Sequence, residues 1–200
     1  MYTGLITDTA AIVSIDKAHM RGACHRPVEA TTGQSIAISG CCLTVVDHSN
    51  NQLTFDLNPE TWQKTHFSTL IKGDLVNIEY SLRADQLLDG HLVSGHVDTT
   101  GEIIHMQKEN HSIHYQIGFT PAFQKWVVEK GSIAVDGISL TINQCSDASL
   151  QVCVIPHTYA VTNLASKSVG DLVNLEFDMM AKFFEKQIQP YIQHIQKETI

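Results

Sequence analysis

Two short segments of the chain carry small polar side chains at matching places. Cys42 and Thr44 are two residues apart in the first segment, and Ser139 and Thr141 are two residues apart in the second. Residues i and i+2 of a β-strand point to the same face. Each pair therefore puts two hydrogen-bonding groups on one face, where they can bind the carbonyl groups of a flat heterocycle. One such pair is ordinary, but two at matching positions indicate two similar pockets.

A third polar group lies in the segment Gly-His-Leu-Val-Ser-Gly-His-Val-Asp at residues 90–98. If this segment is a continuous strand, Ser94, His96 and Asp98 share one face and His91 lies on the other, although Gly95 could bulge the strand. A histidine can be an acid–base group, a metal ligand or an ordinary hydrogen-bonding residue. A metal is disfavoured because the local spacing supplies no third ligand. The acid–base and structural interpretations of these histidines both stay open.

Two proline-containing loops occupy matching positions, Asn58–Thr61 and Ile155–Thr158. They mark places where backbone can approach a ligand, although prolines also serve as simple breaks between elements. Lys130 is the only basic residue near the start of the neighbouring strand, and a solvated surface lysine is its plainest interpretation. No dinucleotide-binding, P-loop, nucleophile-elbow or zinc-protease motif accompanies these residues.

The matching positions arise because the chain is an internal duplication. A gapless similarity with an offset of 97 residues begins at residues 35–44, and the first few residues of each half align at a shorter offset. A period near a hundred residues is too long for a solenoid, so the chain consists of two modules of one kind. The clearest matches join 35–44 to 132–141, 73–79 to 170–176, Pro59 to Pro156, and 3–6 to 94–97.

Each module has the pattern of a small β-barrel. Short runs rich in β-branched residues at 35–38, 42–46, 52–57 and 75–80 are separated by glycines or polar turns, and 48–51 predicts a hairpin turn. About six such strands per module predict a closed barrel, which leaves no exposed sheet edge. The expected fold is therefore all-β, a tandem duplication of a six-stranded Greek-key-like β-barrel.

Three segments are expected to be helical. Residues 59–65 predict a helical turn, and 121–128 begins with a proline at a favourable first position. From Met179 to Ile200 the apolar residues recur at helical spacing, among them Ile192 and Ile195, and Pro190 should kink or restart that helix. The apolar stripe of this C-terminal α-helix must be buried either on its own chain or on another subunit.

Composition limits the classes of protein that remain. The chain has 200 residues, 43% of them hydrophobic, and a formal net charge of −8. An acidic chain lacks the basic surface that a nucleic-acid-binding protein needs. No run is long enough to span a membrane, and no basic, apolar leader begins the chain. Five cysteines without a regular spacing form a poor disulfide framework. We therefore expect a soluble, cytoplasmic protein with reduced thiols.

The motifs taken together resemble the riboflavin synthase α-chain. They are Met-Tyr-Thr-Gly-Leu-Ile at the start, Gly-Cys-Cys-Leu-Thr-Val at 40–45, Gly-His-Leu-Val-Ser-Gly-His-Val-Asp at 90–98, Lys-Gly-Ser-Ile-Ala-Val-Asp-Gly-Ile-Ser-Leu-Thr at 130–141 and Ile-Pro-His-Thr at 155–158. Each motif alone is weak, but the set is specific. The resemblance extends from Met1 to about Lys186, and the tail beyond Lys186 carries no motif that matches.

The resemblance implies a transferase that catalyses the final step of riboflavin biosynthesis. Two molecules of 6,7-dimethyl-8-ribityllumazine dismutate, one giving a four-carbon unit to the other, to yield riboflavin and 5-amino-6-(D-ribitylamino)uracil. The family uses no cofactor and no metal. It implies a homotrimer held partly by C-terminal helices, with each site between the first barrel of one subunit and the second barrel of a neighbour. Enclosure by lumazine synthase stays open.

The resemblance also implies site residues, which we carry over by position. The polar side chains expected to act in catalysis are Ser35, Cys42, His96, Ser139, Thr141 and Asp178. The residues expected to contact substrate are Gly4, Leu5, Ile6, Cys42, Leu43, Thr44, Asp56, Leu57, Asn58, Pro59, Glu60, Thr61, Gly95, His96, Val97, Lys130, Ser139, Leu140, Thr141, Cys153, Val154, Ile155, Pro156, His157 and Thr158. We interpret His96 as a proton-transfer or orienting group, and no single general base is assigned.

The domain boundaries follow from the duplication. We expect a lumazine-binding barrel at residues 1–86, a second at 87–178, and an oligomerisation helix at 179–200. The halves differ at two chemically important places, because Leu5 aligns with His96 and Cys42 aligns with Ser139. Such asymmetry suits a reaction in which one bound molecule gives and the other receives. The rival hypothesis is a non-catalytic antenna protein of the same fold, which binds a lumazine or flavin as a chromophore.

Overall fold

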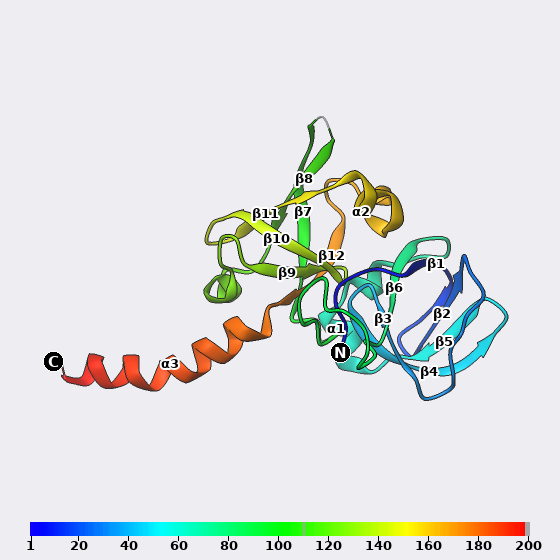
Figure 1. The fold of residues 1–200 in the computed structure, drawn as a ribbon, viewed down its shortest axis with the longest axis horizontal. Helices are drawn as coiled ribbons and strands as arrows, with labels where there is room; N and C mark the ends of the chain where they lie inside the picture. Colours follow the sequence, from blue (N-terminus) through cyan, green and yellow to red (C-terminus); the bar gives the residue numbers. More distant parts are fainter. Residues whose placement is uncertain (110, 199–200) are drawn as a thin grey trace.

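The computed structural model describes residues 1–109 and 111–198, without the side chains of 192, 193 and 195–198. It contains two closed barrels of six strands each, and both have the same strand order (Figure 1). The first barrel consists of β1 (Asp8–Ile15), β2 (His19–Cys24), β3 (Ser35–Ile38), β4 (Cys41–Ser49), β5 (Gln52–Asp56) and β6 (Leu75–Tyr80). The second consists of β7 (Thr99–Glu109), β8 (Ser112–Gly118), β9 (Ser132–Val135), β10 (Ile138–Cys145), β11 (Ser149–Val154) and β12 (Leu172–Phe177). The predicted duplicated all-β fold is confirmed.

Alternating strands close each barrel around its own apolar core. In β4, Cys41, Leu43 and Val45 are buried inside the barrel, while Cys42 and Thr44 point outward. The same alternation places Ile138 and Ile142 in the core of the second barrel. The adjacent Cys41 and Cys42 therefore point to opposite faces of the barrel wall. Because the interior is filled by side chains, ligands must bind on the outer faces.

Short helices interrupt the strands where prolines occur. The expected helical turn is α1 (Pro59–Lys64), which begins after Asn58, whose side chain accepts a hydrogen bond from the Thr61 amide. The segment at 121–128 forms a 3₁₀ helix, Pro121–Trp126. Further 3₁₀ turns are His66–Thr69 and Asn163–Ser166. The second module also contains α2 (Pro156–Val161), which the sequence did not predict although α1 is its counterpart.

The two barrels meet along an approximate two-fold axis. Nδ2 of Asn77 donates to the Asp136 carbonyl at 2.9 Å, and Nδ2 of Asn174 donates to the Ser39 carbonyl at 2.8 Å. Each bond is the copy of the other under the duplication. Close approach is possible because a Cβ atom on Gly40 would lie 2.6 Å from the Gly137 amide nitrogen. The barrels are thus joined by backbone contact and buried polar bonds.

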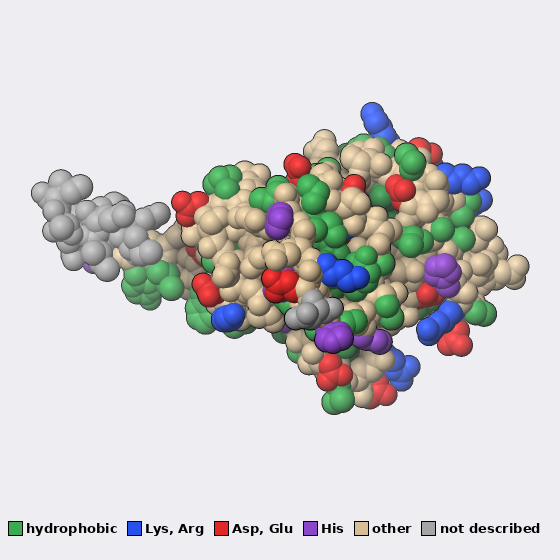
Figure 2. All heavy atoms as spheres, turned by 90° about the horizontal axis from the view of Figure 1, so that it is seen from above, with side chains coloured by type: hydrophobic (Ala, Val, Ile, Leu, Met, Phe, Trp, Pro, Cys, Tyr) green, Lys and Arg blue, Asp and Glu red, His purple; other side chains and the backbone are tan. Residues whose placement is uncertain are grey.

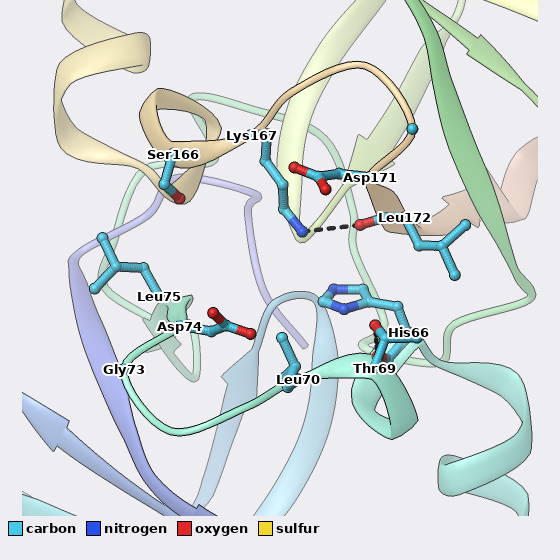
Figure 3. Close-up of a pocket in the computed structure, with 11 residues that line it drawn as sticks. His66, Thr69, Leu70, Gly73, Asp74, Leu75, Ser166, Lys167, Asp171 and Leu172 are labelled. Carbon is cyan, nitrogen blue, oxygen red and sulfur yellow. Dashed lines mark hydrogen bonds between the residues drawn. The ribbon is translucent and has the colours of Figure 1, made fainter.

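A hollow of about 680 Å³ also lies at this boundary (Figure 3). Most of its lining residues are equivalent pairs from the two modules: Thr69 and Ser166, Leu70 and Lys167, Gly73 and Gly170, Asp74 and Asp171, Leu75 and Leu172, joined by His66. Nζ of Lys167 donates to the Leu172 carbonyl at 2.8 Å. None of the residues expected to act on substrate lines this hollow, so it is a feature of the barrel boundary.

The C-terminal helix α3 (Met179–Glu198) extends away from the barrels (Figure 1). Its first turns are fixed to the second barrel, because Nζ of Lys182 contacts Asp98 and the carboxylate of Glu185 accepts from Lys125 and Trp126. The helix runs through Pro190 without restarting there. Its apolar side chains Met180, Phe183, Phe184, Ile188 and Tyr191 are 49–72% exposed, and Figure 2 shows apolar side chains on the projecting helix. The predicted stripe positions Ile192 and Ile195 lie outside the described side chains.

Candidate functional site

The first candidate site lies on the outer face of β4. Cys42 is half-buried and Thr44 is exposed on the same face, and Ser35 of β3 is the direct neighbour of Thr44. Cys42 and Thr44 line a pocket of about 430 Å³ that reaches across β5 to α1, and Ser35 is not part of its lining. Its lining comprises Cys42, Leu43, Thr44, Val46, Asp56, Leu57, Asn58 and Thr61. Seven of these eight residues were expected from the sequence to contact substrate; Val46 was not.

The thiol of Cys42 accepts a hydrogen bond from a buried tyrosine. The Tyr2 hydroxyl donates a hydrogen bond to Sγ of Cys42 at 3.1 Å, and Tyr2 has no exposed surface. Tyr2 was not expected to belong to the site. The only sequence signal was its place beside the Thr3–Ile6 motif, and that motif does not say which strand the ring contacts.

The second candidate site lies on the equivalent face of β10. Ser139 is half-buried and Thr141 is exposed there. Oγ of Ser139 lies 2.6 Å from Nδ1 of His91, which approaches from the segment between the barrels. Burial lowers the pKa of His91 below its ordinary value, and the charge of Asp178 partly opposes that effect. The ring is therefore neutral near pH 7 and can exchange a proton with the serine hydroxyl.

His91 is the candidate site residue that the sequence most clearly missed. The expected continuous strand placed it on the face opposite His96, with a bulge at Gly95 as the alternative. The structure contains no strand at residues 94–98, because β7 begins only at Thr99. Gly95 has a φ of +82°, which a continuous strand does not allow. The shared face predicted for Ser94, His96 and Asp98 is therefore wrong.

The two segments before the barrels pack on opposite barrels. Gly4, which leads into the first barrel, accepts a hydrogen bond at its carbonyl from the Ser139 amide at 2.9 Å. Gly95, which leads into the second barrel, accepts one from the Cys42 amide at 2.8 Å. Ile6 packs against the core of the second barrel and Val97 against the core of the first. The sequence grouped these segments with the site but could not indicate this crossing.

Because the segments cross, the two sites contain different chemical groups. Leu5 follows Gly4 at the Ser139 site and is 45% exposed. His96 follows Gly95 at the Cys42 site and is also exposed. The first site therefore combines a thiol with a solvent-accessible imidazole, and the second combines a serine, a half-buried imidazole and an apolar side chain. The predicted asymmetry between the halves is thus present at the sites as well.

The remaining expected residues lie around the second site or away from both. Cys153 points outward on β11, at the position equivalent to Asp56, and its Sγ lies 3.8 Å from Nε2 of His114. Val154 and Pro156 line a hollow of about 260 Å³. Ile155, His157, Thr158, Pro59 and Glu60 belong to or adjoin the short helices α2 and α1.

Asp178 and Lys130 lie at the ends of elements. The Asp178 carboxylate accepts a hydrogen bond from the Met180 amide at the start of α3, and its charge reaches His91. Lys130 adopts a φ of +65° in the turn before β9, and its amide donates to the Ile142 carbonyl. The Lys130 side chain is exposed and does not line the pocket beside Cys42. Its expected substrate contact stays a prediction.

Within 1–109 and 111–198, no group of three or more His, Cys, Asp or Glu side chains is arranged to hold a metal ion. Over the same ranges, no helix is long and apolar enough to cross a membrane.

Comparison with known proteins gives consistent matches in sequence and structure. A family model described as a lumazine binding domain matches residues 3–81 and again 94–178. The chain is 40% identical to the riboflavin synthase of Bacillus amyloliquefaciens, over 100% of this chain and 95% of that protein. It is 34% identical to the riboflavin synthase of Schizosaccharomyces pombe, over 100% of this chain and 99% of that protein.

Solved structures share the duplicated fold. The structure of LumP complexed with riboflavin superimposes with a TM-score of 0.80 at 23% identity, covering 88% of this chain and 99% of that one. The structure of LumP complexed with 6,7-dimethyl-8-(1'-D-ribityl) lumazine gives a TM-score of 0.77 at 21% identity, with the same coverage. At this level of identity the similarity extends to the fold alone.

Proposed function

Since this chain belongs to the riboflavin synthase family and carries two lumazine-binding domains, we propose that it acts as a transferase on two lumazines. One molecule of 6,7-dimethyl-8-ribityllumazine gives a four-carbon unit to the other. The products are riboflavin and 5-amino-6-(D-ribitylamino)uracil, and the reaction is the last step of riboflavin biosynthesis. The observation that carries this proposal is the pair of equivalent outer-face sites, centred on Cys42 and Ser139, with different polar groups.

We assign the residues of each site according to their contacts. At the second site, the Ser139 hydroxyl bonds to or activates the ring, and His91 holds that hydroxyl at 2.6 Å. Thr141 supplies a second hydroxyl on the same face. At the first site, Cys42 acts beside the other ring and His96 transfers a proton or orients the substrate. Ser35 and Asp178 complete the proposed set.

Holding two rings together supplies much of the acceleration. A proton must leave the acidic 7-methyl group of one lumazine, and C7 of the other must be attacked. Well-oriented intramolecular reactions reach effective molarities of ~10⁵ M or more. Acid–base groups such as His96 and the Ser139–His91 pair add to this effect.

We further propose that the active assembly is a homotrimer. The exposed apolar side chains of α3 support this, because a helix with such a face gains stability when another subunit covers it. Each active site would then join the first barrel of one subunit to the second barrel of its neighbour. Cytoplasmic location is proposed as well, since all five cysteines are free thiols, as a reducing compartment favours. Association with lumazine synthase is a separate proposal, which co-sedimentation of the two proteins tests.

The decisive experiment is turnover by the purified full-length protein. We expect chromatography to show riboflavin and the pyrimidine in equal amounts, with two lumazines consumed for each riboflavin, and excess EDTA to leave the rate unchanged. The antenna alternative, favoured only by the fold of LumP, predicts a stably bound chromophore and no product. Bound lumazine without turnover would therefore overturn the enzymatic proposal.

A further inference from the structure

Two buried glutamates occupy equivalent positions on the outer faces of β6 and β12. Glu79 and Glu176 are each 4% exposed, and they correspond under the duplication. A buried carboxylate is costly unless hydrogen bonds satisfy it. Neither residue adjoins the pocket beside Cys42, and neither carries a role in the reaction proposed above. Their partners therefore indicate what they do.

Glu79 binds the segment that leads into the first barrel. Its Oε1 accepts hydrogen bonds from the Thr3 amide at 2.6 Å and the Thr3 hydroxyl at 2.8 Å. Its Oε2 accepts from the Gly4 amide at 3.0 Å. Burial raises the pKa of Glu79, and the amides of Thr3, Gly4 and Leu5 oppose that rise because they stabilise the charged form. Successive amides around one carboxylate form a compact anion-binding nest.

Glu176 binds the corresponding segment of the second module in the same way. Its Oε1 accepts from the Ser94 amide at 2.6 Å and the Ser94 hydroxyl at 2.7 Å. Its Oε2 accepts from the Gly95 amide at 2.9 Å. The Ser94 hydroxyl also accepts from the His96 amide at 3.2 Å, as the Thr3 hydroxyl does from Leu5 at 3.1 Å. The same device therefore occurs twice in one chain.

Because the segments cross, each glutamate binds a segment that contacts the opposite barrel. Glu79 belongs to the first barrel, but the Gly4 carbonyl that follows its nest receives the Ser139 amide of the second barrel. Glu176 belongs to the second barrel, but the Gly95 carbonyl receives the Cys42 amide of the first. Each carboxylate therefore binds a segment of its own module on one side. The other side of that segment contacts the candidate site of the opposite barrel.

We propose that Glu79 and Glu176 are positioning residues, each controlling ligand binding at the site of the opposite barrel. Glu79 sets the place of the Gly4–Ile6 segment at the Ser139 site. Glu176 sets the place of the Gly95–Val97 segment, with His96, at the Cys42 site. The inference rests on the proposed lumazine sites, but the direction of control follows from the hydrogen bonds alone.

The chain's own cysteines report on the two sites separately. Cys42 lines the first site, and Cys153 occupies the position in the second module that corresponds to the pocket-lining Asp56. Both thiols are half-buried, whereas Cys145 is exposed and serves as the reference for alkylation. In the test, the full-length protein is alkylated at increasing concentrations of 6,7-dimethyl-8-ribityllumazine, and mass spectrometry measures the protection of each thiol.

Glu79→Gln and Glu176→Gln are matched variants for this test. Glutamine keeps one acceptor oxygen, but its NH₂ group faces the glycine amide, so that hydrogen bond is lost. We expect Glu79→Gln to raise the lumazine concentration for half-protection of Cys153 about tenfold and to leave that of Cys42 nearly unchanged. Glu176→Gln should do the reverse.

Milder variants guard against misfolding. Thr3→Val and Ser94→Ala each remove one hydroxyl from a nest, and Thr3→Ser and Ser94→Thr restore it. We expect Thr3→Val to weaken protection of Cys153 and Ser94→Ala to weaken protection of Cys42, each less than the glutamine variants do. Thr3→Ser and Ser94→Thr, which keep the hydroxyl, should behave as the unaltered chain. A purely structural role would lower the stability of the protein without separating the two thiols.

Four results would overturn the inference. Weaker protection in the same barrel as the substituted glutamate would reverse the proposed direction. Equal weakening at both thiols, or no change at either in a folded variant, would remove the positioning role while leaving the sites in place. If lumazine protected neither thiol of the unaltered chain, the proposed binding sites themselves would be wrong and the inference would fail with them.

Discussion

Oδ1 of Asp136 lies 3.0 Å from Nε2 of His66, although the two side chains belong to different barrels. Both residues are almost completely buried. Nδ2 of Asn163 donates to Oδ2 of the same carboxylate at 2.7 Å, and the Asn174 amide donates to Oδ1 at 2.7 Å. The equivalent of Asp136 in the first module is Ser39, so the duplication is broken at the centre of the boundary. The buried Asp136 carboxylate, with its hydrogen-bond partners, therefore joins the two barrels.

Asp136→Asn should destabilise the protein. The amide group cannot accept hydrogen bonds from both sides as the carboxylate does, so at least one buried donor loses its partner. Removing one partner of such a buried pair costs about 3–5 kcal/mol. Denaturant unfolding should measure a lower free energy of unfolding, while Asp147→Asn, at an exposed aspartate in the turn between β10 and β11, should change little. Equal stability of the two variants would show that the network does not hold the barrels together.

The same carboxylate predicts a defined pH dependence. Burial alone would raise the pKa of Asp136, but His66, Lys167 and the Asn174 amide lower it from 3.8 to about 2. A group with a lowered carboxyl pKa adds stability above its unfolded pKa and loses that contribution as the pH falls toward its folded pKa. The difference in unfolding free energy between the unaltered chain and Asp136→Asn should therefore narrow as the pH falls from about 4 to about 2.

Comparing the two proteins at each pH removes the contributions of titrating groups that do not contact Asp136. Glu79 has a raised pKa and makes the opposite contribution, which weakens as the pH rises. That contribution is common to both proteins and cancels in the difference. A difference that widened on acidification would contradict the assigned direction.

Gly95→Ala tests the close packing of the crossing segments. A Cβ atom at Gly95 would lie 2.6 Å from Cβ of Cys42, and the residue has a φ of +82°. Gly73 provides a matched control, because its φ is +100° and a Cβ there meets nothing within 4 Å. Both substitutions carry the same kind of backbone strain, about 1 kcal/mol. Only Gly95→Ala should also lose lumazine binding at the Cys42 site, measured by protection of that thiol. Similar losses for both variants would mean that backbone strain, and not packing, explains the effect.

The strands were predictable because their cause is local. A short β-branched run at 35–38 and an alternating run at 75–80 predicted strands at the observed bounds of β3 and β6. The duplication then indicated equivalent outer faces for Cys42 and Ser139. These inferences needed only the period of a strand and the comparison of one half with the other.

The crossing of Gly4 and Gly95 was not predictable for a physical reason. Aligning the halves shows which segments correspond, but both the crossed and the uncrossed arrangement satisfy the same alignment. The choice depends on long-range hydrogen bonds, from the Ser139 amide to Gly4 and from the Cys42 amide to Gly95, which gave no local signal. His91 was missed for the same reason, because its bond to Ser139 joins residues 48 positions apart. Its neighbourhood was instead interpreted as a strand.

His91→Gln should change the pH profile of the reaction. Since burial lowers the pKa of His91, the ring becomes protonated only below its ordinary value of 6.5. If the neutral ring assists Ser139, kcat/KM should fall on the acid side with an apparent pKa below 6.5. The variant should be slower, by about 10²-fold or more, and should lack that acid limb. If the slower variant still showed the same fall of kcat/KM at acid pH, the titrating group would be a residue other than His91.

Two point substitutions on α3 test its role in assembly without removing the helix. Phe183 and Phe184 are 60% and 61% exposed, whereas Lys182 and Glu185 on the other side of the helix are fixed to the second barrel. Exposed aromatic side chains lose their hydration cost when another subunit covers them, at about 25 cal/mol per Å² of buried apolar area. Phe183→Ser with Phe184→Ser should therefore convert the proposed trimer to monomers in sedimentation velocity, as should truncation after Asp178. Lys186→Ser, a change of similar size away from the apolar face, should leave the trimer intact.

Because each proposed active site joins two subunits, the dissociated protein should also lose turnover while the Cys42 and Cys153 thiols keep weak protection by lumazine. A truncated chain that sediments as a trimer of unchanged stability would show that the barrels, and not the helix, carry the assembly.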